Sequence, residues 1–286
     1  WRMEDTELYC FIGKDNLFFH TILFPALLIA HGGYILPENV VVNEFVNLEG
    51  EKLSTSRGWV IWLHDMLKKF HPDMIRYYAA AIAPEHKDTD FKWRDFQAKV
   101  NNELIANLGN FIYRVLTLIR KLYGGVIPEP GKLDEHDEEV LSEISKTAER
   151  VAAEVERFEF KKGLREIMRL SSIGNGYLNA KRPWSNPDEA PSTLYVASQI
   201  IHALSILLIP YLPFTAVEIR RMLNLPTNLN DVRWRDLEKR LEPGHRIGEV
   251  KPLFRKVRDE DIAPEVEKLK KLRARYEAEA GPPRAH

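Results

Sequence analysis

The chain has 286 residues, 44% of them hydrophobic, and a formal net charge of -1. This composition supports folded cores and excludes a largely disordered protein. The near-neutral net charge excludes a protein whose overall positive charge attracts RNA at long range, so any RNA contact must come from a local patch. The single cysteine, Cys10, excludes an internal disulfide and a cysteine-based zinc site, and it fits a reducing cytoplasm.

The first fifty residues predict part of an α/β sheet. Residues 8–12 form a short apolar run that ends at Gly13, which is typical of a buried parallel strand. A helix is predicted over 16–30 and a second strand over 40–46. The strand–helix–strand order favours a parallel pair. Because the chain opens almost directly into a strand, we expect upstream sequence to be missing.

A polar loop over 51–58 separates this sheet from a part of the chain that is almost wholly helical. No apolar run reaches the 18 residues of a membrane span, so none is predicted. Short connections between amphipathic segments indicate an antiparallel bundle. Apolar residues at helical spacing predict helices over 59–70, 73–83, 93–123, 134–159, 161–180, 190–209, 213–223 and 265–280.

Six short motifs carry more information together than any one of them alone. They are Phe11-Ile12-Gly13-Lys14-Asp15 with Phe19-His20, and then residues 52–56, 73–78, 106–111, 182–184 and 251–256. In this order and at this spacing they resemble the methionyl-tRNA synthetases, which are class I aminoacyl-tRNA synthetases, over about residues 5–262. Lys52-Leu53-Ser54-Thr55-Ser56 stands in the place of the family's KMSKS loop.

The resemblance implies a fold class and a division of the chain. The fold is an α/β partial Rossmann-type parallel sheet followed by an all-α antiparallel helix bundle. Residues 1–50 are expected to be the second half of the catalytic domain, and residues 51–92 the KMSKS-like loop with a connecting helical segment. Residues 93–230 are expected to be the anticodon-binding bundle, and residues 231–286 a tail that packs back toward the catalytic side.

The resemblance also implies a function: ATP-dependent activation of methionine, with Mg²⁺ accompanying ATP, and transfer of methionine to tRNA(Met) in the cytoplasm. The family's upstream HIGH motif and its zinc-bearing insertion are absent from this sequence. We therefore expect no zinc here and no activity from this chain alone, with the HIGH motif supplied by a missing N-terminal half or a partner chain. One alternative is a non-catalytic tRNA anticodon-binding module. Another is a sister class I synthetase for leucine, isoleucine, valine or cysteine.

The loop in the place of KMSKS contains the residues expected to contact ATP phosphates. Lys52 is the candidate for the charge contact, while Ser54, Thr55 and Ser56 offer hydroxyl groups without charge. Thr55 stands where the family has a second lysine, so another cation must replace it or the stabilisation is weaker. The alternative is a solvated surface loop.

Candidate residues for the two small substrates follow the first strand. Gly13 allows close approach of a ligand to the backbone, and Asp15 by resemblance accepts the ribose hydroxyls of ATP, although it can also cap the next helix. By resemblance Phe19, His20 and Phe24 belong to the methionine pocket, where aromatic walls suit a soft thioether. The alternative for His20 is a buried structural histidine.

The anticodon reader is expected on the long helix and in the loop that contains Trp184. Asn107 is the base-contacting position by resemblance, Asn110 is close to it, and Arg114 lies two turns farther along the same face. Phe111 stands where some family members have an arginine, and Arg114 is a candidate to replace it. The alternatives are a surface ion pair for Arg114 and a hydrophobic lid for Trp184 rather than a stacking platform.

Two groups of basic residues accompany this reader. Lys181 and Arg182, directly before Pro183-Trp184, are candidates to hold phosphates. A second basic run is interpreted as a solvated face rather than a contact, and consists of Lys161, Lys162, Arg165 and Arg169.

Overall fold

The computed structural model describes residues 1–3 and 5–280, and the chain divides into two compact units. The first unit contains residues 1–60 and 82–92, and the second contains residues 61–81 and those from 93 onward. The chain therefore passes between the units three times. Of the domain boundaries expected from the sequence, the one after residue 92 coincides with such a passage, whereas the segment 51–92 is shared between both units.

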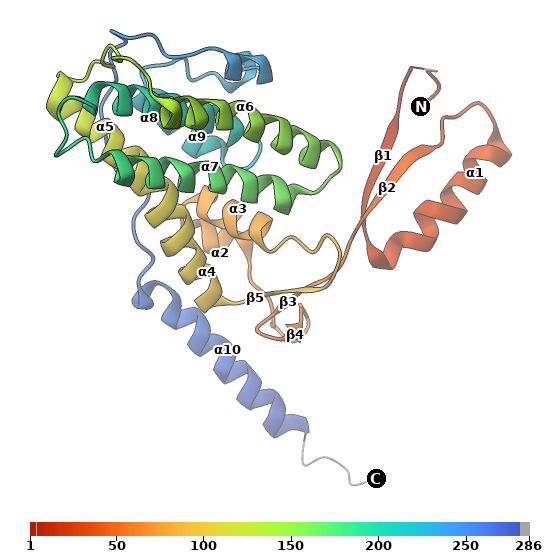
Figure 1. Ribbon diagram of the computed structural model, residues 1–286. Coiled ribbons are helices and arrows are strands. Elements are labelled where there is room, and N and C mark those ends of the chain that lie inside the picture. Colours follow the sequence, from red (N-terminus) through yellow and green to blue (C-terminus); the bar gives the residue numbers. More distant parts are fainter. Residues whose placement is uncertain (4, 281–286) are drawn as a thin grey trace. The chain divides into compact units, whose positions relative to one another are not determined.

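The first unit begins with the predicted parallel pair of strands. Gly13, at the end of the first strand, lies opposite Asn43 at the end of the second. The helix predicted over 16–30 is helical without a break, but it begins in a 3-10 turn and has a π-helical segment in its middle. Pro25, in the first turn of the α-helix that follows, cannot donate to that segment. The elements are β1 (Leu8–Gly13), η1 (Lys14–Asn16), η2 (Phe19–Leu23), α1 (Phe24–His31) and β2 (Pro37–Asn43) (Figure 1).

A second, three-stranded sheet completes this unit. The strand β3 (Val46–Leu48) pairs antiparallel with β4 (Glu51–Lys52) and parallel with β5 (Thr89–Phe91). The prediction of one strand over 40–46 joined the end of β2 to the start of β3, and β5 was not predicted. Leu48 is fully buried, so this small sheet has its own apolar centre.

The loop after β4 is closed by a tryptophan. Trp59 pairs with Ser54 in an isolated antiparallel bridge, and its indole Nε1 donates to the carbonyl of Leu48 at 2.9 Å. The predicted helix over 59–70 is therefore wrong at its start, since the observed helix begins only at Leu63. Trp59 is 2% exposed, which makes it the anchor of the loop rather than part of an amphipathic helix.

The second unit is helical, as predicted. The predicted helix over 93–123 is continuous, but its central part, η3, is π-helical. The helices are α2 (Leu63–Leu67), α3 (Pro72–Ala81), α4 (Trp93–Lys99), η3 (Val100–Gly109), α5 (Asn110–Tyr123), α6 (Glu135–Glu156), α7 (Phe160–Lys181), α8 (Ala190–Leu207), α9 (Pro213–Met222), η4 (Leu229–Asp231), η5 (Trp234–Glu238) and α10 (Asp259–Ala280).

Helix α8 is the core of this bundle. In the described part of the chain it is the one helix whose length and apolar composition would suffice to cross a membrane, contrary to our expectation that no segment would. Of that stretch, 94% is buried inside the protein, as in the core helix of a globular bundle. The buried amide of Gln199 is satisfied on both sides: it donates to the Leu241 carbonyl and accepts from the Leu241 N–H.

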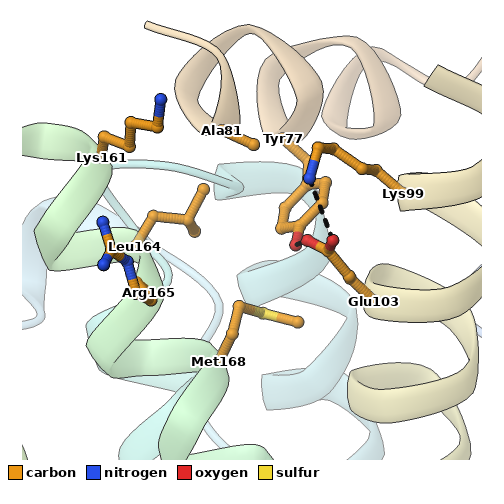
Figure 2. A pocket seen from close by; sticks show the side chains of 8 residues that line it. All are labelled: Tyr77, Ala81, Lys99, Glu103, Lys161, Leu164, Arg165 and Met168. Carbon is orange, nitrogen blue, oxygen red and sulfur yellow. Dashed lines mark hydrogen bonds and ion pairs between the residues drawn. The ribbon is translucent and has the colours of Figure 1, made fainter. Parts of the chain in front are cut away.

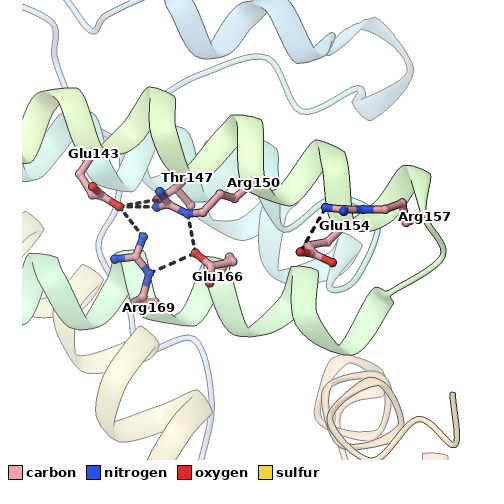
Figure 3. A network of polar contacts seen from close by, with 7 residues as sticks. All are labelled: Glu143, Thr147, Arg150, Glu154, Arg157, Glu166 and Arg169. Atoms are coloured by element: carbon pink, nitrogen blue, oxygen red, sulfur yellow. Dashed lines mark hydrogen bonds and ion pairs between the residues drawn. The ribbon is translucent and has the colours of Figure 1, made fainter. Parts of the chain in front are cut away.

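An ion network joins α6 to α7, which lie side by side (Figure 3). Arg150 donates to Glu166 at 2.7 Å and also to Glu143, and Arg169 contacts the same two carboxylates. Burial alone would raise the pKa of Glu143 and Glu166, but the hydrogen bonds from the two arginines outweigh it and hold both pKa values low. Arg169 is therefore part of the helix interface.

Two long-range contacts fix the ends of the bundle. Asp73 on α3 is fully buried and accepts hydrogen bonds from the Thr215 N–H and hydroxyl, at 2.6 and 2.7 Å, in the first turn of α9. The C-terminal tail returns to α4 and η3, where the Asn101 amide both donates to the Val257 carbonyl and accepts from its N–H. Helix α10 follows this clamp, six residues earlier than predicted.

Candidate nucleotide and anticodon sites

The first candidate site lies where β1 ends. A Cβ on Gly13 would lie 2.7 Å from Oδ1 of Asp15, so a larger residue at position 13 would make this carboxylate shift away from the end of the strand. Asp15 itself is exposed and lies in the 3-10 turn η1. The carboxylate predicted to accept the ribose hydroxyls is therefore accessible at the carboxyl end of a parallel strand. Its role stays a prediction.

Lys14, between these two residues, is engaged within the protein. Its Nζ donates to Glu44 at 2.5 Å and Asp88 at 2.6 Å and lies 4.4 Å from the centre of the Phe45 ring. The hydrogen bonds to Asp88 and Glu44 raise the pKa of Lys14. Lys52, the predicted phosphate contact, lies over the same Phe45 ring at 5.4 Å. Phe45 thus connects the two predicted ATP segments, a role that sequence reasoning missed.

The loop in the place of KMSKS is a short, ordered turn. The hydroxyls of Ser54 and Ser56 lie 3.2 Å apart, and the Thr55 carbonyl accepts the Gly58 N–H. Arg57 donates to the Lys52 carbonyl at 3.3 Å and lies 3.8 Å from a carboxylate oxygen of Glu51. The loop therefore has a second cation at position 57, although Thr55 stands where a lysine was expected.

The three residues predicted for methionine lie together. The rings of Phe19 and Phe24 stack with their centres 6.4 Å apart, and His20 lies 5.3 Å from Phe19 and 6.3 Å from Phe24. The Nδ1 atom of His20 is 3.1 Å from the carbonyl of Asn16, one turn earlier. Trp1 contacts Phe24 edge-on at 6.0 Å, and no motif in the sequence pointed to it.

In the second unit, Asn107 is engaged with α7. Its amide nitrogen donates to the Met168 carbonyl and the Ser172 hydroxyl, both at 3.0 Å, and its side-chain oxygen accepts from Asn175 at 3.0 Å. The amide therefore holds η3 against α7 in this structure. Reading a base would require it to exchange one of these partners, and its predicted role remains untested.

Arg114 and Trp184 lie together, seventy residues apart in the sequence. The Arg114 guanidinium carbon is 5.4 Å from the centre of the Trp184 ring, and its Nη2 donates to Asn179 at 3.1 Å. Trp184 remains 49% exposed, so one face can accept a stacked base. Asn110 is exposed one helical turn before Arg114. In place of the surface ion pair that was the alternative for Arg114, the described residues give it this cation–π contact and the hydrogen bond to Asn179.

Phe111 lies in the core. Its side chain is fully buried, and Gly174 on α7 faces its ring so closely that a Cβ there would lie 2.4 Å from Cζ. A residue at this position faces the bundle and not the surface that carries Trp184. The arginine next to Trp184 is therefore Arg114. The buried Phe111 does not belong to the exposed group of Asn110, Arg114 and Trp184.

Lys181 is not available to phosphate, which corrects our expectation. Its side chain is 9% exposed and contacts Asp134, Asp137 at 2.9 Å and Glu189 at 3.4 Å. Burial alone would lower the pKa of Lys181, but the hydrogen bonds to Asp134 and Asp137 raise it far above its usual value. This lysine fixes the end of α7 just before the loop with Trp184, whereas Arg182 is exposed.

Comparisons with known proteins follow the same division of the chain. A family model described as tRNA synthetases class I (M) matches residues 1–116, and one described as the anticodon binding domain of methionyl tRNA ligase matches residues 127–274. The methionine–tRNA ligases of Flavobacterium psychrophilum and Christiangramia forsetii are each 46% identical, over 94% of this chain and 40% of the relative. The chain therefore spans about 40% of the length of these curated relatives.

A solved structure shows the same fold. Mycobacterium tuberculosis methionyl-tRNA synthetase in complex with methionyl-adenylate superposes with a TM-score of 0.81 at 25% identity, covering 86% of this chain and 49% of that one. This confirms the predicted fold class, a parallel sheet followed by a helix bundle. The anticodon-domain match alone spans more than half of the 286 residues. With the synthetase match before it, this shows that the chain belongs to the methionyl-tRNA synthetase family.

Proposed function

We propose that this chain serves in the ligation of methionine to tRNA(Met), by contributing part of the ATP site and the reader of the anticodon. The observation that carries the proposal is the contact of Arg114 with the half-exposed ring of Trp184. Family membership supplies the context, since the curated relatives are methionine–tRNA ligases. The cytoplasm is the proposed compartment.

The proposed reader combines stacking with hydrogen bonding. An unstacked base lies on the free face of Trp184, while Arg114, already against the ring, presents donors to the base edge. The hydrogen bond that Arg114 donates to Asn179 fixes the direction of the guanidinium before RNA arrives, which reduces the entropy lost on binding. Asn110, which is exposed one turn before Arg114, is proposed to contact the neighbouring nucleotide.

The proposed role in ATP chemistry is alignment and charge stabilisation. The methionine carboxylate attacks the α-phosphate and pyrophosphate leaves, which requires no protein acid or base. Lys52 and Arg57 are the cations proposed to face the phosphates, and Asp15 is proposed to accept the ribose hydroxyls. Mg²⁺, arriving with ATP, supplies further charge neutralisation. The hydroxyls of residues 54–56 complete the loop.

We also propose that further catalytic-domain residues cover the first unit, in the same polypeptide or a partner chain with the HIGH motif. Large apolar side chains of this unit are exposed, which is unusual for a complete domain. They are Phe11, Phe18, Ile22, Leu27 and Ile29, each more than half exposed. The methionine pocket of Phe19, His20 and Phe24 is proposed to close only when that surface is covered.

The first test is the affinity of the full chain for tRNA(Met) and for the same tRNA with its anticodon altered, at two salt concentrations. A large loss on altering the anticodon, at both salt concentrations, would support base reading. Equal affinities that fall steeply with salt would show phosphate contacts alone and would overturn the proposed reader. Arg114→Ala is the informative variant, with exposed Arg120→Ala on the same helix as its control.

A non-catalytic tRNA-binding module is the second candidate function. The observation that favours it is the exposure of the predicted methionine residue Phe19, at 45%. Methionine-dependent pyrophosphate exchange, measured after an upstream half with the HIGH motif is added to this chain, separates the two. Exchange that requires Lys52 supports the ligase, whereas its absence alongside intact anticodon discrimination supports the module.

A further inference from the structure

An interhelical seam in the second unit leads to the proposed reader. The continuous helix of η3 and α5 forms one side of it and α7 forms the other, and side-chain hydrogen bonds cross between them. Three asparagines contribute amides to this seam: Asn107, Asn175 and Asn179. An amide side chain carries two N–H donors and one oxygen acceptor, so the bonds that each makes within the protein decide what remains for RNA.

The first two amides use their donors within the protein. The amide nitrogen of Asn107 donates to the Met168 carbonyl and the Ser172 hydroxyl. The amide nitrogen of Asn175 donates to the main-chain and side-chain oxygens of Asn107 and lies 3.2 Å from the Ser171 carbonyl. Neither amide therefore has an N–H group left for a base unless the contact between η3 and α7 is broken.

Polar groups at the far end of the seam are also engaged. A cavity of about 380 Å³ lies there, and Figure 2 shows that Tyr77 and Lys99, which line it, both point to Glu103. The Tyr77 hydroxyl donates to Glu103 at 2.5 Å and Lys99 Nζ donates to it at 3.1 Å. These bonds hold α3 and the start of η3 together, whereas the exposed ring of Trp184 follows the other end of α7.

Asn179 differs from the other two asparagines. It is exposed in the last turn of α7, and its Oδ1 accepts a hydrogen bond from Nη2 of Arg114 at 3.1 Å. A guanidinium group has no acceptor, so the oxygen of the amide must face Arg114 and the nitrogen must face away from it. This nitrogen has no hydrogen-bond partner among the residues that the structure describes, so its N–H groups are available to a ligand.

The guanidinium of Arg114 connects this amide to the aromatic ring. Its carbon lies 5.4 Å from the centre of the Trp184 ring, while its Nη2 is bonded to Asn179. The amide oxygen is occupied by that bond, so the polar groups that the pair presents are N–H donors. A base stacked on Trp184 therefore meets donors from two different helices.

Neighbouring donors select among bases by the order of acceptors on the base edge. Cytosine has N3 and O2 side by side on its Watson–Crick edge. In uracil the N3–H donor separates the two carbonyl oxygens, and in adenine an amino donor stands beside N1. Guanine has adjacent acceptors in O6 and N7, but the methionine codon AUG pairs with the anticodon CAU, which contains no guanine. The base that fits this pair in tRNA(Met) is therefore cytosine.

We propose that Asn179 is a further base-reading residue, which donates from its amide nitrogen to an acceptor on the base stacked on Trp184, beside Arg114. The inference rests on the proposed function, since it assumes that this surface reads the anticodon. It adds a reader from α7, whereas the sequence pointed only to Asn107 and Asn110 on the long helix. Specificity then depends on both helices and on the contact that holds them together.

The most informative variant is Asn179→Asp in the full chain. Aspartate keeps an oxygen for Arg114 but has no N–H group, so it separates orientation of the guanidinium from donation to the base. Ala180→Asp is the matched control, because Ala180 is exposed on the same turn and its side chain points about 100° away around the helix axis. Both variants add the same charge near the same helix end, so their effects on folding and on long-range electrostatics are matched.

The measurement is the affinity for tRNA(Met) and for the same tRNA with the anticodon cytosine changed to uracil, at two salt concentrations. For Asn179→Asp we expect the ratio of the two affinities to fall about tenfold, because one donor to the cytosine edge is lost. For Ala180→Asp both affinities should fall together, more at low salt, and the ratio should stay unchanged.

Three outcomes of this measurement would contradict the reasoning. An unchanged ratio in Asn179→Asp, with a reduced ratio in Arg114→Ala, would overturn the inference and leave the proposed function standing. An equal fall of the ratio in both aspartate variants would also overturn it, because charge alone would then explain the loss. A wild-type chain that does not distinguish the two anticodons would overturn the proposed function and this inference with it.

A double-mutant cycle separates direct donation from support of Arg114. If Asn179 acted only by holding the guanidinium, Asn179→Ala would have no effect on the affinity ratio in the Arg114→Ala background. We expect instead a further fall of about fivefold in that background, since the amide donors are then removed as well. Absence of this further fall would overturn the base-reading role and leave Asn179 as a support for Arg114 alone.

Discussion

The contact between Gly174 and Phe111 allows a sharp test of how the anticodon bundle is packed. A Cβ at position 174 would lie 2.4, 2.7 and 2.9 Å from three ring atoms of Phe111, which is fully buried and cannot swing into solvent. Overpacking of this kind costs about 1–3 kcal/mol, and three such contacts place it at the upper end. Alanine recovers about 1 kcal/mol of helix propensity, so Gly174→Ala should destabilise by about 2 kcal/mol.

The sign of the effect should depend on Phe111. In a Phe111→Leu background the far ring atoms are gone, so Gly174→Ala should become neutral or stabilise by up to about 1 kcal/mol. Gly176→Ala on the same helix is the control, since nothing lies within 4 Å of its added Cβ, and it should stabilise in both backgrounds. Urea unfolding followed by far-UV circular dichroism measures all four differences. A Gly174→Ala chain as stable as wild type would refute the packing argument.

Four other substitutions test separate features of the second unit. Trp184→Ala should remove about 1–3 kcal/mol of stacking, a loss of roughly 5- to 150-fold in tRNA(Met) affinity, with an unchanged thermal midpoint; unaltered binding would contradict the reader. Burial, together with the nearby charge of Arg220, lowers the pKa of His202 to about 4. Because the unfolded chain binds the imidazole proton more tightly, the contribution of His202 to the free energy of unfolding is constant above about pH 6.5 and falls by about 3 kcal/mol toward pH 4. The variant His202→Gln should flatten this pH profile in urea titrations at several pH values. The variant Asp73→Ala leaves the Thr215 donors buried without an acceptor, and it should destabilise the protein by about 2–4 kcal/mol in the same assay. A change below about 0.5 kcal/mol, roughly the effect of a surface substitution, would count against the role of Asp73 in capping α9. Lys181→Met leaves Asp137 buried without its cation and should destabilise by about 3 kcal/mol, whereas an equally stable variant would show that the pair contributes little.

Local patterns predicted most of the elements. The apolar run over 8–12 and the strand order predicted the parallel pair, although the predicted burial of the first strand is wrong, since Tyr9 and Phe11 are exposed in this unit. Gly124-Gly125 predicted the end of the longest helix, and Gly124 indeed has a positive φ of 59° at its C-cap. These features depend on neighbours in the sequence, so the sequence contains the information directly.

Contacts distant in the sequence accounted for the errors. Trp59 has the spacing of an amphipathic helix, but its indole hydrogen bond to Leu48 and its bridge to Ser54 hold it in an extended turn. The strand β5 has three residues and exists only through its pairing with β3, more than forty residues earlier. No local pattern distinguishes such segments from a helix or a loop.

The candidate sites show the same limit. Arg114 and Trp184 were each predicted from the sequence, but their contact across seventy residues was not. Lys181, beside a functional tryptophan, looked like a phosphate ligand until the structure placed three carboxylates around it. Charge counted along the sequence does not reveal which cations are already neutralised.

The π-helical segment η3 has a consequence for how this protein can change in evolution. Each i→i+5 turn takes up one more residue than an α-turn, which rotates every later side chain by about 100° around the axis. Through η3 the buried residues Val100, Leu104 and Leu108 follow one another at intervals of four. Deleting one residue within η3 would preserve the helices but turn Arg114 away from Trp184. Length variation between homologues should thus be confined to loops. The number of residues in the helix from Trp93 to Tyr123 should stay constant.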